Sequence, residues 1–190
     1  MQLNIYIISH PIIQQLSSQI ICSTTKIDNT YNRKCKQLGF LMIHEVMRTW
    51  MQIQNIYIKK INQTKQLCIL KKEESYIVFT DLINSHNIIT EAIDLIPQVE
   101  LNHVNFEQKS IPNDNIHYSS QVEIKKKQKV IIINLKFNNN KIIHFLDYLI
   151  IEKHVKISQI KIICITCKHQ VLEKMGNKYP ALNIYTTNIT

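Results

Sequence analysis

Glycine is nearly absent from this chain. Only 2 of its 190 residues are glycine, Gly39 and Gly176, whereas average usage of about 7% predicts roughly 13. Two isolated glycines exclude the Gly-rich motifs of dinucleotide-binding folds, P-loop nucleotide hydrolases and nucleophile elbows. Alanine and arginine are also rare, while Ile, Lys and Asn are abundant. The abundant residues have A+T-rich codons, which indicates a mutationally skewed genome such as that of an organelle.

The chain also lacks the features of exported and membrane-spanning proteins. It has no run of 18 apolar residues, so no membrane span is predicted. Its N-terminus has no basic segment, and His10-Pro11 interrupts the only apolar stretch there, so we expect no signal peptide. Five cysteines, an odd number in a chain of this length, argue against a disulfide framework and favour a reducing compartment.

The chain is basic, with a formal net charge of +9. Basic proteins meet nucleic acid, anionic membranes or acidic partners, but Lys-rich codon bias also produces a solvated basic surface. The densest cluster is Lys125-Lys126-Lys127 with Lys129, and few aromatic residues lie near it in the sequence. Because arginine is also scarce, stacking and bidentate contacts with nucleic acid are not favoured. We expect protein partners instead.

The clearest predicted helix covers residues 31–54. Its apolar residues recur at three- and four-residue steps on two faces. The first face holds Tyr31, Cys35, Leu38, Met42, Val46 and Trp50, and the second holds Phe40, Ile43, Met47 and Met51. Such breadth means burial on two sides, either entirely within the core or partly against a partner chain.

The remaining pattern alternates between strands and helices. Short apolar runs at 67–70, 76–79, 130–133, 160–165 and 182–185 predict strands, as does the alternation at 99–104. Helical spacing appears at 85–96, where Ser85 could be the cap, and at 142–153 and 169–175. This order predicts a single α/β domain over residues 1–190, with a mainly parallel sheet and helices on both faces. Residues 107–129 are polar and are interpreted as a surface excursion, in which a β-hairpin around Tyr118 and Val122 is one alternative.

Two local patterns invite a chemical interpretation but favour a structural one. Cys164 and Cys167 form a CxxC with His169 nearby. Two thiols three residues apart on a strand point to opposite faces, and a redox CxxC should open a helix. His144 and Asp147 could touch on a helix, which suits a surface pair better than a catalytic dyad. We therefore predict no metal site and no cofactor.

The carboxyl edge of the sheet is the place to look for a ligand, because open α/β sheets bind ligands there. That edge includes the segment Asn134–Lys141. A phosphate site would use free backbone amides at a helix N-terminus. Here Asn138-Asn139-Asn140 stands where close approach usually demands glycine. A solvated turn is the simpler interpretation.

Three stretches of the chain carry a family resemblance. They are HPIIQQLSSQI at residues 10–20, YNRKCKQLGFLMIHEVMRTW at 31–50 and ISQIKIICITCKHQVLEKMGNKYPALNIYTTNIT at 157–190. Together they resemble uracil phosphoribosyltransferases, although none is a catalytic motif. The resemblance covers most of the chain and implies a type I phosphoribosyltransferase fold. In an active member it would imply transfer of ribose 5-phosphate from phosphoribosyl pyrophosphate to uracil, with Mg²⁺-bound pyrophosphate.

The resemblance also implies where the functional groups would lie, and the chain departs from the family there. The family's Arg-Ala-Gly segment, which contacts pyrophosphate, falls on Ile83-Asn84-Ser85. The signature Asp falls on Asn134, and the Ala-Thr-Gly-Gly-Ser loop falls on Asn138-Asn139-Asn140-Lys141-Ile142. The arginine, the acidic residue and the glycines are all replaced, and only Lys141 could supply a phosphate-binding charge. The uracil-binding segment would begin where the chain stops, at Thr190.

These departures predict a catalytically inactive homolog that acts as a structural or interaction subunit of a larger assembly. Each lost electrostatic contact is worth roughly 2.7–4 kcal/mol of transition-state stabilisation, so several losses should leave no useful rate. The alternatives are UMP formation, binding of a phosphorylated ligand at Lys141 and Asn138–Asn140, and nucleic-acid binding through Lys125–Lys129. The likeness starts within the first ten residues, so we expect no transit peptide. A plastid-encoded protein of a photosynthetic or ribosomal assembly is the favoured candidate, and a cytoplasmic protein is the alternative.

Overall fold

The computed structural model describes residues 3–23, 28–71, 74–106 and 122–190. Within these ranges the chain forms a central six-stranded sheet in which every pairing is parallel. In spatial order the strands are β1 (Asn4–Ile7), β8 (Asn183–Ile189), β7 (Ile160–Cys167), β6 (Lys129–Phe137), β4 (Tyr76–Thr80) and β5 (Val99–His103). The α/β class and the mainly parallel sheet predicted from the sequence are confirmed.

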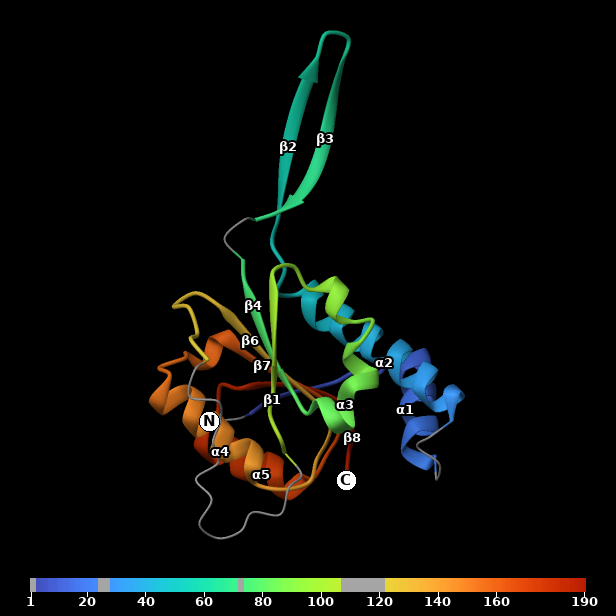
Figure 1. Ribbon diagram of the computed structural model, residues 1–190, viewed down its shortest axis with the longest axis vertical. Coiled ribbons are helices and arrows are strands. Elements are labelled where there is room, and N and C mark those ends of the chain that lie inside the picture. Colours follow the sequence, from blue (N-terminus) through green and yellow to red (C-terminus); the bar gives the residue numbers. More distant parts are fainter. Residues whose placement is uncertain (1–2, 24–27, 72–73, 107–121) are drawn as a thin grey trace.

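Helices cover both faces of this sheet (Figure 1). One face carries α1 (Pro11–Cys22), α2 (Asn29–Arg48) and α3 (Leu82–Ile89), and the other carries α4 (Lys141–Asp147) and α5 (His169–Lys178). A π-helical turn, Tyr148–Glu152, extends α4, and 3-10 turns occupy Ile93–Leu95 and Ile157–Gln159. Alternate side chains of β6 pack on opposite faces of the sheet. Ile131 packs with α2, and Ile132 packs with α4 and α5.

The long helix α2 is shorter than the sequence predicts. It begins after Asp28, whose carboxylate accepts the Thr30 N–H at 3.3 Å, and it ends at Arg48. The predicted range of 31–54 is therefore wrong at its C-terminal end, where Ile53 already starts a strand. Apolar residues continue without a break across this boundary, so the helical spacing alone did not mark it.

Both apolar faces of α2 lie in the core. Ile43 and Met47 of the second face are buried, and only Phe40 remains 40% exposed. Gly39 allows α3 to approach closely, because a Cβ at Gly39 would stand 2.0 Å from the carbonyl oxygen of Ile88. The interpretation that α2 is buried entirely within its own chain therefore fits, apart from Phe40.

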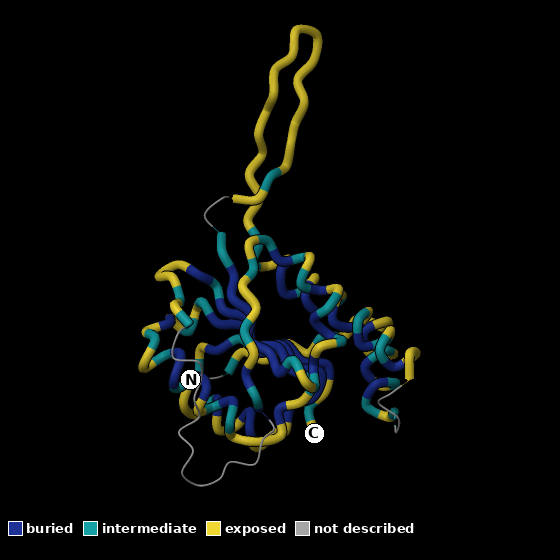
Figure 2. The backbone as a smooth tube through the Cα atoms, viewed as in Figure 1, coloured by how far each residue is buried: buried dark blue, intermediate teal, exposed yellow. Residues whose placement is uncertain are grey.

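A two-stranded antiparallel hairpin projects away from this body (Figures 1 and 2). It consists of β2 (Ile53–Lys60) and β3 (Gln63–Leu70), and we call residues 53–70 the arm. All of its described residues are exposed except one, which is intermediate. The sequence predicted a strand only at 67–70. No face of the arm packs on the core, so no apolar alternation marks β2.

The segment after β4 also differs from its prediction. The helix begins at Leu82 and ends at Ile89, whereas 85–96 was predicted. Its N-cap is Asp81, whose Oδ1 accepts the N–H groups of Ile83 at 3.1 Å and Asn84 at 3.4 Å, so the predicted Ser85 cap is wrong. Asp81 meets the ordinary N-cap pattern, an acidic residue directly before the first apolar helical residue.

Most of the predicted excursion at 107–129 lies outside the described residues, and so does Tyr118 of the alternative hairpin. The described part, 122–128, contains no strand, and β6 starts at Lys129. None of the described helices combines enough length with enough apolar character to cross a bilayer.

Candidate functional site

The carboxyl edge of the sheet brings together two segments that lie far apart in the sequence. Ser85 of α3 and Asn134 of β6 share a buried hydrogen bond, in which the Ser85 hydroxyl donates to Asn134 Oδ1 at 2.6 Å. The N–H of Leu135 donates to the same Oδ1 at 2.8 Å and to Ser85 Oγ at 3.1 Å. Asn134 Nδ2 donates to the carbonyl of Lys136 at 3.2 Å. Because Asn134 is only 1% exposed, its amide is committed to contacts within the protein.

The three positions that would correspond to the pyrophosphate segment lie in the first turn of α3. Ile83 is exposed, Ser85 is fully buried, and Asn84 donates from Nδ2 to Asp81 Oδ2 at 2.9 Å. Asp81 is itself fully buried. A carboxylate therefore occupies this helix N-terminus, which is the kind of place where an anion would otherwise bind. The sequence reasoning did not single out Asp81.

The segment that would correspond to the phosphate loop is also held by its own side chains. Asn139 Nδ2 donates to the carbonyl of Phe106 at 2.7 Å, and Asn139 Oδ1 accepts the N–H of Lys141 at 3.1 Å. Asn140 Oδ1 accepts from Lys174 Nζ at 3.3 Å. None of the residues in 134–141 has a positive φ. The side chain of Asn139 therefore already occupies the backbone amide of Lys141, which a phosphate would otherwise use.

The sequence predicted that the two CxxC thiols point to opposite faces of the sheet, and this prediction is wrong. Cys164 and Cys167 are both fully buried in the apolar cluster beneath α4 and α5. The strand pairings of β7 skip Ile165, whose carbonyl accepts the hydroxyls of Thr186 at 3.2 Å and Thr187 at 2.8 Å. Side-chain alternation is interrupted there. A hydrogen bond with Cys167, together with burial, raises the pKa of the Cys164 thiol well above its ordinary value, which is typical of an inert cysteine.

Two other patterns noted in the sequence, the His144–Asp147 pair and the basic cluster, contribute hydrogen bonds and ion pairs within the protein. Asp147 accepts from Lys178 Nζ at 2.6 Å and from the Tyr179 hydroxyl, and its described partners do not include His144. In the basic cluster, Lys129 pairs with Glu74 at 2.9 Å. No group of three His, Cys, Asp or Glu side chains in the described ranges could hold a metal ion.

A parallel sheet covered on both faces, with strand-to-helix turns at its carboxyl edge, defines a doubly wound α/β protein. A family model described as uracil phosphoribosyltransferase matches residues 7–190. The chain therefore belongs to the uracil phosphoribosyltransferase family, as its resemblance predicted.

Curated relatives agree with this assignment. Proteins described as "Uracil phosphoribosyltransferase homolog" from Porphyra purpurea and Pyropia yezoensis are each 28% identical to the chain over 189 residues. Each match covers 100% of this chain and 89% of the relative. Among solved structures, the AQ2163 protein from Aquifex aeolicus superposes with a TM-score of 0.77 and 17% identity, covering 97% of this chain and 86% of that protein. This likeness supports the fold alone.

Proposed function

We propose that this chain has lost the transferase activity of its family and serves as a protein-interaction subunit of a larger assembly. The observation that carries the proposal is Asn134. The resemblance implies an acidic residue at this position, and the chain has a neutral amide there instead. Its oxygen is occupied by Ser85 and by the N–H of Leu135. No anionic group at this position is free to meet a substrate.

The other two segments support the same conclusion. The pyrophosphate-binding arginine that the resemblance implies would fall on Ile83, and the helix begins after the Asp81 carboxylate. In the phosphate segment, Asn139 caps the Lys141 amide. Lys141 alone could attract phosphate, but a site without a bidentate cation, and with one backbone amide already occupied, is expected to bind phosphate weakly.

The arm supports the interaction part of the proposal. Its large apolar side chains are exposed: Ile53, Ile56, Tyr57, Ile58, Ile61, Leu67 and Leu70. An isolated two-stranded hairpin is only marginally stable in water, so a partner that covers it would account for its length. Its charged residues are all lysines, Lys59, Lys60 and Lys65. The matching surface is therefore expected to be apolar with an acidic rim.

The catalytic part is tested by an assay for UMP formation from radiolabelled uracil with phosphoribosyl pyrophosphate and Mg²⁺. We expect no UMP above background from a chain whose cooperative thermal unfolding shows that it is folded. UMP formed at ordinary enzyme rates would contradict the proposal and favour pyrimidine salvage. Thermal stabilisation by phosphoribosyl pyrophosphate without turnover would favour another alternative, in which the chain still binds a phosphorylated ligand near Lys141.

The interaction part is tested by affinity purification of the tagged chain from its own organism. We expect a stable larger complex with the full chain. The matched control is a variant in which the arm is replaced by a short Gly-Ser turn, and we expect it to recover the chain without the complex. Purification of only monomer or homodimer would contradict the interaction subunit.

We also propose a plastid location for this assembly. The support is the A+T-biased composition, rich in Ile, Lys and Asn. Immunoblotting of fractionated cells tests it: enrichment with plastids is expected, and enrichment with the cytosol would contradict it.

A further inference from the structure

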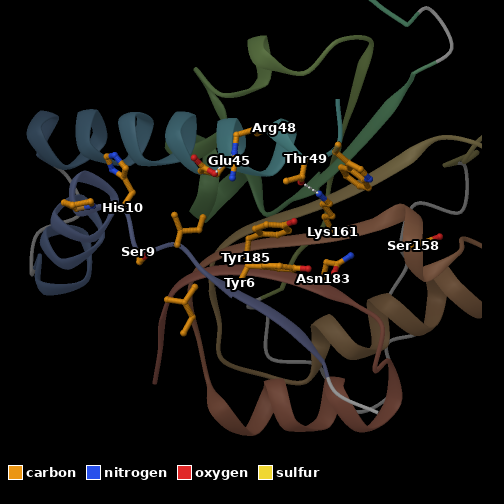
Figure 3. Close-up of a pocket in the computed structure, with 14 residues that line it drawn as sticks. Tyr6, Ser9, His10, Glu45, Arg48, Thr49, Ser158, Lys161, Asn183 and Tyr185 are labelled. Atoms are coloured by element: carbon orange, nitrogen blue, oxygen red, sulfur yellow. Dashed lines mark hydrogen bonds and ion pairs between the residues drawn. The ribbon is translucent and has the colours of Figure 1, made fainter. Parts of the chain in front are cut away.

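A cavity of about 900 Å³ lies beside β1, β8 and β7, next to the C-terminal end of α2 (Figure 3). Its walls are β1 with the segment that follows it to Pro11, the first residues of β8, the start of β7 and the C-terminal end of α2. Its volume falls within the range of about 300–1,000 Å³ that is usual for small-molecule sites. Its polar lining includes Glu45, Arg48, Thr49, Lys161 and Asn183.

Lys161 is the unusual group in this cavity. It interrupts the apolar strand β7 and is only 5% exposed. Its Nζ donates to Thr49 Oγ1 at 2.8 Å and to the carbonyl of Val46 at 3.4 Å. An ammonium has three donors, and within the described ranges the third finds no hydrogen-bond acceptor.

Lys161 also has no carboxylate partner among the described residues. Glu45 of the same cavity pairs with Arg48 at 3.2 Å, and Glu74 pairs with Lys129 at 2.9 Å. A buried ammonium without a counter-ion is costly. Burial, and secondly the charge of Lys129, lower the pKa of Lys161 to about 8. The site therefore lacks one negative charge.

Aromatic rings surround this ammonium. Its Nζ lies 4.7 Å from the ring centre of Trp50 and 5.1 Å from that of Tyr185. Tyr6 on the edge strand stacks on Tyr185, with 4.8 Å between ring centres and 16° between planes. Flat rings beside a cation provide a surface on which a planar ligand can stack.

We propose that this cavity binds a small aromatic carboxylate, with the carboxylate on Lys161 Nζ and the aromatic ring against Tyr6, Trp50 and Tyr185. His10 at the same cavity adds polar character, while the charge of Arg48 is paired with that of Glu45. A single negative charge fits better than a phosphate. Lys161 offers one free donor, and the adjacent end of α2 is its C-terminus, where the helix dipole is negative.

Lys161 lies apart from Asn134. Lys161 pairs in register with Ile131, three residues before Asn134 on the neighbouring strand. At about 3.3 Å per residue this places the two levels roughly 10 Å apart along the strands. The two sites can therefore be tested independently, and the cavity does not depend on whether transferase activity is retained.

The chain carries its own probe for this site, because Trp50 is its single tryptophan. The full chain would be titrated with benzoate while Trp50 fluorescence is followed, with thermal stabilisation as a second readout. Benzamide has the same shape without the charge, and acetate has the charge without the ring. We expect saturable binding of benzoate, and binding weaker by about tenfold or more for each of the other two.

Lys161→Met tests the residue itself, since methionine is apolar and of similar length. We expect it to weaken benzoate binding by about tenfold or more, because a charge-assisted hydrogen bond is lost. Lys136→Met, on the exposed end of β6, is the matched control and should bind like the native chain. Tyr6→Ala should weaken benzoate more than acetate. The proposal is overturned if the native chain shows neither a fluorescence change nor stabilisation, or if folded Lys161→Met binds benzoate unchanged.

Discussion

At the residue scale, Ser85 and Asn134 show that polar side chains at the carboxyl edge of the sheet bond to one another within the protein. Ser85→Ala removes the 2.6 Å bond to Asn134 Oδ1 at a fully buried position. We expect it to lower the free energy of unfolding by about 1–2 kcal/mol, because a buried acceptor loses a partner. Urea denaturation measures the change. Ser18→Ala, at an exposed position of α1, is the control and should change stability by less than about 0.5 kcal/mol.

Lys161 gives a prediction about pH. Its pKa is lowered from 10.5 to about 8 in the folded chain, so between these values the unfolded chain binds more protons. The contribution of Lys161 to folding stability therefore rises as pH increases from about 8 towards 10. Above pH 10 the buried Tyr31 opposes this trend, because burial raises its pKa to about 12.

Lys161→Met should abolish this rise. The measurement is the difference in unfolding free energy between the native chain and the variant at several pH values, so that contributions common to both chains cancel. We expect the variant to be relatively more stable at pH 7 and to lose this advantage by pH 10. A difference that does not change with pH would show that Lys161 is not desolvated. Lys136→Met should show no such trend.

At the scale of elements, the two glycines make a matched pair. A Cβ at Gly39 would lie 2.0 Å from the Ile88 carbonyl oxygen, whereas a Cβ at Gly176 would meet Leu3 Cβ at 3.4 Å. Gly39→Ala should destabilise the chain by about 1–3 kcal/mol, since α2 and α3 must separate. Gly176→Ala, inside α5, should be neutral or stabilising by up to about 1 kcal/mol. Thermal unfolding compares them, and equal effects would contradict this account of the α2–α3 contact.

Much of the sheet could be predicted at this scale, because strands buried on both faces are continuous apolar runs. Ile131 and Ile162 lie in such runs, and the structure places both in the central sheet. Only the strand at 67–70 of the arm was predicted, since neither of the arm's faces packs on the core and its residues do not alternate cleanly.

The two candidate sites could also be predicted only in part from the sequence. A family motif marked Asn134, but the contact with Ser85 depends on how α3 sits against β6. The cavity around Lys161 joins residues from distant segments, and the only local signal was one lysine within an apolar strand. That signal could have marked Lys161 as unusual but not named its neighbours.

At the scale of the whole molecule, the arm and the body behave as different parts. The arm leaves the body between Gln52 and Lys71, whose backbones are joined by a 3.2 Å hydrogen bond from the Lys71 N–H to the Gln52 carbonyl. A short turn can therefore replace residues 53–70 without distorting the sheet. That the remaining residues fold as one domain stays a prediction.

Replacing the arm tests this directly. We expect the midpoint of thermal unfolding to change little, because the arm buries almost no apolar surface against the body and contributes little hydrophobic stabilisation. Self-association at high concentration should fall, since a contiguous group of exposed apolar side chains is removed. Calorimetry and light scattering measure the two effects. A variant that unfolds far below the native midpoint would mean that the arm stabilises the body, and the arm would then not be free for a partner.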